Sequence, residues 1–175
     1  MAPDEELLRT ERLRLRAWTT SADDVARLTD LYGRPEVTRW LGNPKVPPAE
    51  LPARWAAVHA QDDRFGCWAI EAPADHRVAG TVLFKPLPNG VGEVEVGWHL
   101  HPDSWGHGYA TEAARAVIDR GFEAGLLEVY AVVRPGNEPS LAVCRRLGMA
   151  SLGRIRRWYD VELEAFRLMA PPVVD

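Results

Sequence analysis

The stretch EVEVGWHLHPDSWGHGYATEAARAVIDRGF, residues 93 to 122, decides the fold that this sequence predicts. Its first part, from Glu93 to His101, is rich in the branched and aromatic residues that strands favour, and Gly97 within it indicates a bulge or a close backbone approach. After a short loop, alanine and larger apolar residues recur at helical spacing as far as Phe122. This spacing predicts an amphipathic helix with one face packed on a sheet.

Gly106 and Gly108 lie between this strand and this helix. Two glycines let the backbone turn tightly, so that the free N–H groups at the helix N-terminus face a phosphate. A tight turn without a ligand is the alternative. The nucleoside-triphosphate loop G-x-x-x-x-G-K-[ST] does not occur in the sequence, and the dinucleotide loop G-x-G-x-x-G/A needs a small residue where Thr111 stands.

The run WGHGYA, residues 105 to 110, resembles the acyl-CoA loop Q/R-x-x-G-x-G/A of the GNAT superfamily of acetyltransferases, with Trp105 in place of the Gln or Arg. The longer run HPDSWGHGYATEA is similar to the RimJ/RimL-like branch, the ribosomal-protein N-terminal acetyltransferases. This resemblance implies acetyl-CoA (coenzyme A) as the cofactor. It assigns the diphosphate to Gly106, His107, Gly108, Tyr109, Ala110 and Thr111, and the pantetheine arm to the backbone N–H groups of Trp98, His99 and Leu100.

The bulk properties favour one domain over residues 1–175, because a hydrophobic content of 46% is ample for a core. A net charge of −4 argues against a nucleic-acid binder. The two cysteines form no C-x-x-C pair, so neither a metal site nor a disulfide framework is predicted. The N-terminal run MAPDEELLRT has no apolar core, and no run is long enough for a membrane span, so a cytoplasmic protein is expected.

The order of the predicted elements is β-α-α-β-β-β-α-β-α-β-β. The expected strands cover residues 11–17, 65–71, 78–85, 93–101, 126–134, 149–158 and 162–169, and a helix is expected over 137–147. This order predicts an α/β fold with a mixed, mostly antiparallel sheet. The resemblance implies a GNAT-type sheet with a splayed central strand pair. It also places the acceptor pocket at 33–62 and 158–163, where Trp40 and Trp55 line the pocket or simply belong to the core.

Asn137, Ser140 and Cys144 are three and four residues apart and share one face of the last helix. The family resemblance implies that Asn137 binds the pantetheine arm, and a helix cap is the alternative. Many GNAT members have a tyrosine in place of Cys144, where it protonates the departing thiolate. The thiols of Cys144 and coenzyme A both titrate near ~8.5, so a proton moves between them with little driving force. Ser140 is expected to donate a hydrogen bond, and the alternative for Cys144 is an inert, buried thiol.

The acceptor amine must lose a proton, and Glu95 is the predicted base. It stands where the resembled branch has E-x-G-Y, here EVGW, and a carboxylate buried in a cleft has a raised pKa. A salt-bridged strand residue is the competing interpretation. His99, Glu162 and Glu164 are lesser candidates for the base.

Together these features predict an N-acetyltransferase that moves an acetyl group from acetyl-CoA to a primary amine, either a protein N-terminus or a small molecule. Attack is expected to be direct, in a ternary complex, since no G-x-S-x-G nucleophile elbow is present. The alternative is a non-catalytic acyl-CoA-binding sensor, which the missing tyrosine and Gln/Arg would favour. A dinucleotide-dependent oxidoreductase is a third interpretation. Either a monomer or a homodimer is compatible with the sequence.

Overall fold

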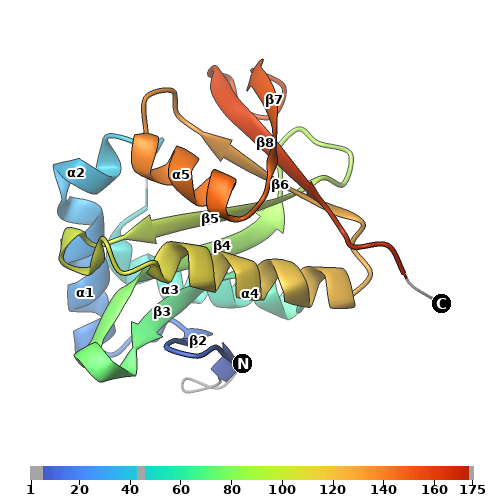
Figure 1. Cartoon of the computed structure of the whole chain (residues 1–175). Helices are drawn as coiled ribbons and strands as arrows, with labels where there is room; N and C mark the ends of the chain where they lie inside the picture. The colour runs from blue at the N-terminus through green and yellow to red at the C-terminus, as the bar shows by residue number, and fades with distance from the viewer. Residues whose placement is uncertain (1–5, 43–45, 174–175) are drawn as a thin grey trace.

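Eight strands form one sheet in the computed structural model, which describes residues 6–42 and 46–173 (Figure 1). The strand order is β1-β2-β3-β4-β5-β6-β8-β7, and only β5 and β6 run parallel to each other. The strands are β1 (Glu6–Arg9), β2 (Arg14–Ala17), β3 (Gly66–Ala72), β4 (Arg77–Pro86), β5 (Val94–Leu100), β6 (Glu128–Val133), β7 (Ala150–Ile155) and β8 (Leu163–Met169). The α-helices are α1 (Ala22–Gly33), α2 (Pro35–Thr38), α3 (Leu51–Gln61), α4 (Tyr109–Glu123) and α5 (Glu138–Arg146).

The predicted fold class, a mixed and mostly antiparallel α/β sheet, is confirmed. Two short elements were not expected, namely β1 and α2, which have four residues each. The strand predicted over 11–17 begins only at Arg14, because residues 10–13 form a turn in which the Thr10 N–H donates to the Leu13 carbonyl. Residues 1–5 of the N-terminal run MAPDEELLRT lie outside the described part of the chain.

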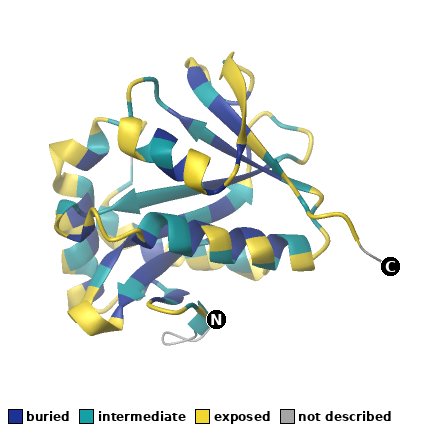
Figure 2. Cartoon of the chain, viewed as in Figure 1, coloured by how far each residue is buried: buried dark blue, intermediate teal, exposed yellow. Residues whose placement is uncertain are grey.

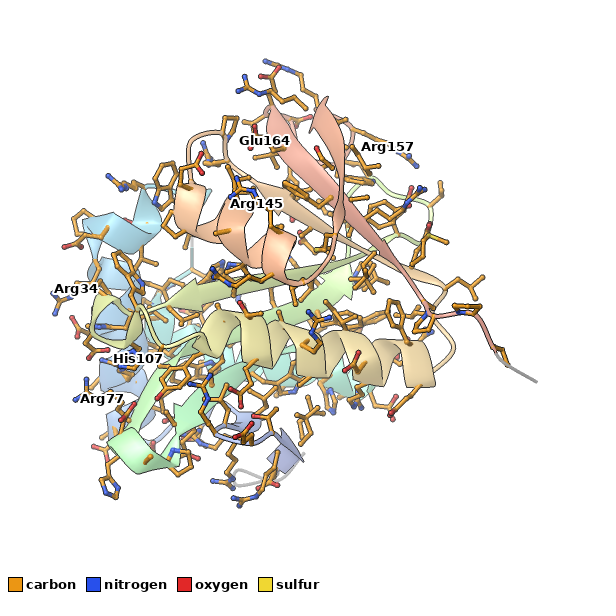
Figure 3. All side chains as sticks on the ribbon, viewed as in Figure 1. Arg34, Arg77, His107, Arg145, Arg157 and Glu164 are labelled. Carbon is orange, nitrogen blue, oxygen red and sulfur yellow. The ribbon has the colours of Figure 1, made fainter. Side chains whose placement is uncertain are left out.

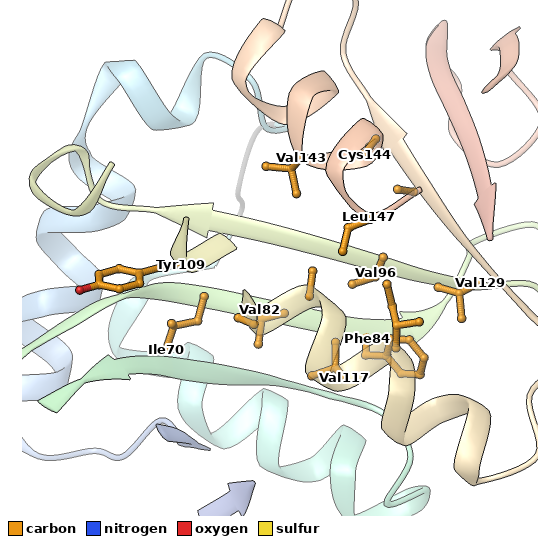
Figure 4. Packing of buried hydrophobic residues seen from close by; sticks show 14 of the residues in the cluster. Ile70, Val82, Phe84, Val96, Tyr109, Val117, Val129, Val143, Cys144 and Leu147 are labelled. Atoms are coloured by element: carbon orange, nitrogen blue, oxygen red, sulfur yellow. The ribbon is translucent and has the colours of Figure 1, made fainter. Parts of the chain in front are cut away.

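The main core lies between the sheet and the pair α4 and α5, which lie side by side in front of it in Figure 1. Figure 4 shows Val82 and Phe84 of β4 and Val96 of β5 facing Val117 of α4. In Figure 2 the buried residues of α4 and of the central strands are dark blue, and the exposed residues of α4 are yellow. The amphipathic spacing of residues 109–122 therefore correctly predicts which face of α4 is buried.

Helices α1 and α3 contribute to a second, smaller cluster built on Trp18, Leu28 and Ala69. Ala69 is on β3, so its side chain points to the face opposite those of its neighbours Trp68 and Ile70. The sheet is thus covered on both faces, with α4 and α5 on one and α1 on the other.

Gly97 allows a close approach within the sheet, but it is not a bulge. The register of β4 and β5 is continuous from Gly80 opposite Leu100 to Pro86 opposite Val94. A Cβ atom on Gly97 would lie 3.0 Å from side-chain atoms of Leu83, the residue opposite it. The close neighbour is therefore a side chain, whereas the sequence indicated a backbone approach.

A buried ion pair holds β2 to α1. The Arg16 guanidinium donates to both carboxylate oxygens of Asp24 at 2.8 and 3.0 Å, and the Thr19 N–H donates to Asp24 at 2.7 Å. Both charged residues are less than 10% exposed. Burial alone would raise the pKa of Asp24, but the hydrogen bonds from Arg16 and Thr19 outweigh it and lower that pKa.

Asp24→Ala should lower the free energy of unfolding by up to about 3–5 kcal/mol, because it removes both charge-assisted hydrogen bonds of the buried Arg16 and leaves it the longer ion pair with Glu71, at 3.6 Å. Denaturant unfolding at neutral pH would measure this loss. Glu50→Gln is the control, since Glu50 and Arg54 form an exposed pair at 3.9 Å that is worth about 0–1 kcal/mol. The depressed pKa means that Asp24 stabilises the fold above its ordinary pKa and loses this effect in strong acid. Equal losses in the two variants would contradict the role of the Asp24 ion pair.

No helix in the described ranges, 6–42 and 46–173, is long and apolar enough to cross a membrane.

Candidate active site

The sheet parts between β5 and β6. Their parallel pairing consists of one residue pair, Glu95 opposite Tyr130, whereas β4 and β5 are paired over seven residues. A cavity of about 1120 Å³ lies at this parting. Its wall is contributed by α2, by the ends of β4 and β5, by the loop before α4, by the β6–α5 connection and by the β7–β8 hairpin. This volume lies slightly above the roughly 300–1,000 Å³ usual for small-ligand pockets.

The N-terminus of α4 forms one end of the cavity. Gly106 and Gly108 have φ values of +79° and +77°, the left-handed conformation that favours glycine. Side chains cap α1 and α5 at their N-termini, but among the described residues no side chain caps α4. The first N–H groups of α4 therefore have no side-chain cap, and their binding of a diphosphate stays a prediction.

Arg12 holds the loop from outside. Its Nη1 donates to the His107 carbonyl at 2.8 Å, and its Nε donates to Glu112 at 2.7 Å. Gly106, Gly108, Tyr109, Ala110 and Thr111 all line the cavity. The His107 side chain, which Figure 3 labels at the loop before α4, is not part of the cavity wall, and its ring stacks on Tyr109 at a centroid distance of 5.2 Å. His107 can thus contribute its backbone N–H, but not its imidazole.

The backbone of β5 offers two of the three predicted N–H groups. The N–H of His101 donates to Ala79 on β4, at 2.9 Å. Alternate residues of a strand point the same way, so the N–H of His99 also faces β4, whereas those of Trp98 and Leu100 face the parting. The predicted use of the His99 amide is therefore wrong, although its side chain lines the cavity. Trp98 and Leu100 provide donors of the kind that the amide groups of a pantetheine arm require.

Asn137 and Ser140 both line the cavity at the start of α5. Asn137 caps the helix, since its side-chain oxygen accepts from the Ser140 N–H at 3.5 Å. Across the parting, the indole Nε1 of Trp98 donates to the Ser140 hydroxyl at 3.2 Å. The capping alternative for Asn137 is thus present, and binding of a ligand by Asn137 and Ser140 stays a prediction.

Cys144 does not reach the cavity. Its side chain is fully buried in the main core, near Leu147 in Figure 4, and it is not among the residues of the cavity wall. Burial raises the pKa of its thiol to about 12, so it is a poor acid and remains protonated. The structure corrects the prediction of a catalytic Cys144 in favour of its alternative, a buried and inert thiol.

Glu95 is 5% exposed and belongs to the cavity wall at the point where β5 and β6 part. Tyr159 donates its hydroxyl to Glu95 Oε1 at 2.5 Å, and Lys85 Nζ lies 3.6 Å from the same oxygen. Burial raises the pKa of the Glu95 carboxyl, and Lys85 and Tyr159 only partly offset this. A carboxylate with a raised pKa suits a base that works near neutral pH.

The lesser candidates for the base are less well suited. Glu162 and Glu164 pair with Arg154 at 3.3 and 3.7 Å and are not part of the cavity wall. His99 lies at the wall, but burial lowers its pKa to about 4. Its Nδ1 is 3.0 Å from the hydroxyl of Tyr32.

Two residues of the site were missed from the sequence, Lys85 and Tyr159. Lys85 stands opposite Glu95 in the antiparallel pair, so the register of the predicted hairpin contained this signal. The contact of Tyr159 with Glu95 spans 64 residues, and no local pattern indicates it. Trp40 lines the cavity, whereas Trp55 packs edge-on against Tyr32 at 6.5 Å.

Comparison with known proteins gives one consistent result. Residues 12–150 match the family model described as the acetyltransferase (GNAT) domain. The uncharacterized N-acetyltransferase YoaA of Bacillus subtilis is 30% identical over 157 residues, which is 87% of each chain. The crystal structure of an acetyltransferase from Agrobacterium tumefaciens is 29% identical, covers 94% of both chains and has a TM-score of 0.77. The ribosomal L7/L12 alpha-N-protein acetyltransferase RimL, solved with coenzyme A, shares the fold at 18% identity and a TM-score of 0.76, over 94% of this chain and 98% of that one.

Proposed function

The chain belongs to the GNAT acetyltransferase family and is an acetyl-CoA-dependent acetyltransferase, and from this premise we propose that it acetylates a primary amine with Glu95 as the base. The amine is that of a protein N-terminus or of a small molecule, and both substrates are held together in the cavity. The observation that carries the proposal is the place of Glu95, a buried carboxylate at the one residue pair that joins β5 to β6.

The residues at one end of the cavity fit the cofactor. The backbone N–H groups at residues 106–111 would hold its diphosphate, and those of Trp98 and Leu100, with the side chain of Asn137, would hold its pantetheine arm. When bound, acetyl-CoA supplies an acetyl group activated as a thioester. The Ser140 hydroxyl accepts from Trp98, so its own proton remains for a hydrogen bond toward the sulfur. A thiolate whose conjugate acid has a pKa near ~8.5 needs no stronger acid, so the burial of Cys144 is no obstacle.

Glu95 accepts the proton that the acceptor ammonium must lose, either directly or through a water molecule. Lys85, His99 and Trp40 also line the cavity, and Lys85 Nζ is 3.6 Å from Glu95. His99 is neutral at physiological pH, because burial lowers its pKa to about 4, so it adds no positive charge that would repel an ammonium group.

The test is a screen of amines with acetyl-CoA at saturating concentration. The panel contains peptides that begin with serine or alanine, lysine, spermidine and an arylalkylamine, and each reaction is followed by thiol release and by the mass of the product. We expect an added acetyl group on at least one amine. Binding of acetyl-CoA in calorimetry without thiol release from any amine would count against the proposed reaction and favour a sensor.

A further inference from the structure

The tip of the β7–β8 hairpin is fixed in place by its contacts with the β4–β5 loop. Trp158 is 2% exposed and packs with Leu87, Tyr130 and Ala165. The side-chain amide of Asn89 donates to the Trp158 carbonyl at 3.1 Å. Next to it, Arg157 forms an ion pair with Glu93. The next residue, Tyr159, therefore extends from an anchored backbone.

Tyr159 and Lys85 converge on one oxygen of Glu95. The Tyr159 hydroxyl and Lys85 Nζ lie 2.5 and 3.6 Å from Oε1. For the other oxygen, Oε2, no hydrogen-bond partner is found in the described part of the chain, and it is not among the buried polar atoms that lack a partner. Oε2 is therefore accessible, and the residue to which it belongs lines the cavity.

We propose that Tyr159 and Lys85 are positioning residues that hold Oε1 of Glu95, so that Oε2 faces the acceptor amine. The inference rests on the proposed function, in which Glu95 is the base. It assigns a role to the hairpin tip, because the anchored Trp158 determines where the Tyr159 hydroxyl lies. The tip is thus part of the catalytic geometry as well as part of the acceptor wall.

The other titratable groups around Glu95 do not compete for this role. Cys67 on β3 is neutral, because burial raises the pKa of its thiol to about 12. Tyr130 on β6 donates its hydroxyl to Glu128 at 2.7 Å. His99, four residues further along β5, contacts Tyr32. Lys85 and Tyr159 remain, and each lowers the pKa of Glu95 against the effect of burial, Lys85 more than Tyr159.

The first experiment measures the Glu95 pKa directly in the full chain by carbon-13 NMR titration, with the signal assigned from Glu95→Gln. Tyr159→Phe and Lys85→Met should each move this pKa upward, and Lys85→Met should move it further. Tyr130→Phe is the matched control, since it removes a buried tyrosine hydroxyl that bonds elsewhere, and the Glu95 pKa should not change. Lys85→Arg keeps the positive charge, so the pKa of Glu95 in this variant should stay at the wild-type value. An unchanged pKa in both Tyr159→Phe and Lys85→Met would overturn the proposal.

The second experiment separates positioning from a merely structural role. With the best amine of the panel, Tyr159→Phe should lower kcat by about 10- to 100-fold, the effect of a misplaced catalytic group, and leave the KM for acetyl-CoA unchanged. The acidic limb of its pH–rate profile should move upward together with the NMR pKa. A raised KM for acetyl-CoA with kcat unchanged would contradict positioning. If wild-type protein acetylates no amine, the proposed function fails, and the NMR titration still decides whether the two residues hold Glu95.

Discussion

Glu95→Gln should lower kcat by about 10²- to 10⁴-fold, the contribution usual for a general base, while the binding of acetyl-CoA stays at the wild-type level. Glutamine keeps the shape of the side chain and still accepts a hydrogen bond from Tyr159, but it cannot take a proton. The measurement is initial-rate kinetics with an amine from the panel. Glu164→Gln is the control, since Glu164 lies outside the cavity wall and pairs with Arg154. Full activity of Glu95→Gln would show that water, and not Glu95, accepts the proton of the acceptor amine.

The raised pKa of Glu95 also predicts how stability depends on pH. A carboxyl group whose pKa is higher in the folded than in the unfolded protein stabilises the fold while it is protonated, below its ordinary value of 4.5. This stabilisation is lost as the pH rises through the folded-state pKa. Wild type should therefore be less stable than Glu95→Gln at neutral pH, and the difference should shrink toward pH 4. Thermal unfolding of both proteins over this range measures it, and a constant difference would contradict the raised pKa.

Gly108→Val should weaken the binding of coenzyme A by roughly 5- to 150-fold, because a β-branched residue at φ +77° carries about 1–3 kcal/mol of backbone strain. Relief of that strain turns the N–H groups of the loop away from the diphosphate. A side chain at this position also approaches Arg12, whose Nη2 would lie 3.4 Å from the new Cβ atom. Isothermal titration calorimetry with coenzyme A measures the change in Kd.

Gly125→Val is the matched control for this variant. Gly125 also has a left-handed backbone, at φ +94°, but it follows the C-terminus of α4, outside the cavity wall. The Gly125→Val protein should lose about as much stability as the Gly108→Val protein, but its Kd for coenzyme A should equal that of wild type. Equal affinity in the two variants would show that the loop at Gly108 does not hold the diphosphate.

The sequence predicts the fold well where the information is local. Residues 93–122 contain their own strand, turn and helix signals, and the structure follows them closely. The strand β1 was missed because ELLR is too short to show an alternating pattern. Helix α2 was missed for a similar reason, since one turn that starts at Pro35 has no recognisable period.

The site is less predictable because its contacts join distant parts of the chain. Helical spacing predicts Asn137 and Cys144 on one side of α5, but Asn137 is the N-cap at the cavity, whereas Cys144 is about 10 Å further along the axis and buried in the main core. Lys85 lies ten residues before Glu95 across a hairpin, and Tyr159 comes from the other end of the sheet. Which face of an element meets a cavity depends on such tertiary contacts.

Because β5 and β6 are joined by a single residue pair, Glu95 and Tyr130, the sheet consists of two parts, β1–β5 and β6–β8, that are only weakly connected. If the pantetheine arm binds at Trp98 and Leu100, as proposed, its amide groups would continue the hydrogen bonding of β5 in place of a neighbouring strand. The stiffness of the sheet then depends on whether the donor is bound, and native-state amide exchange would detect the difference along β5.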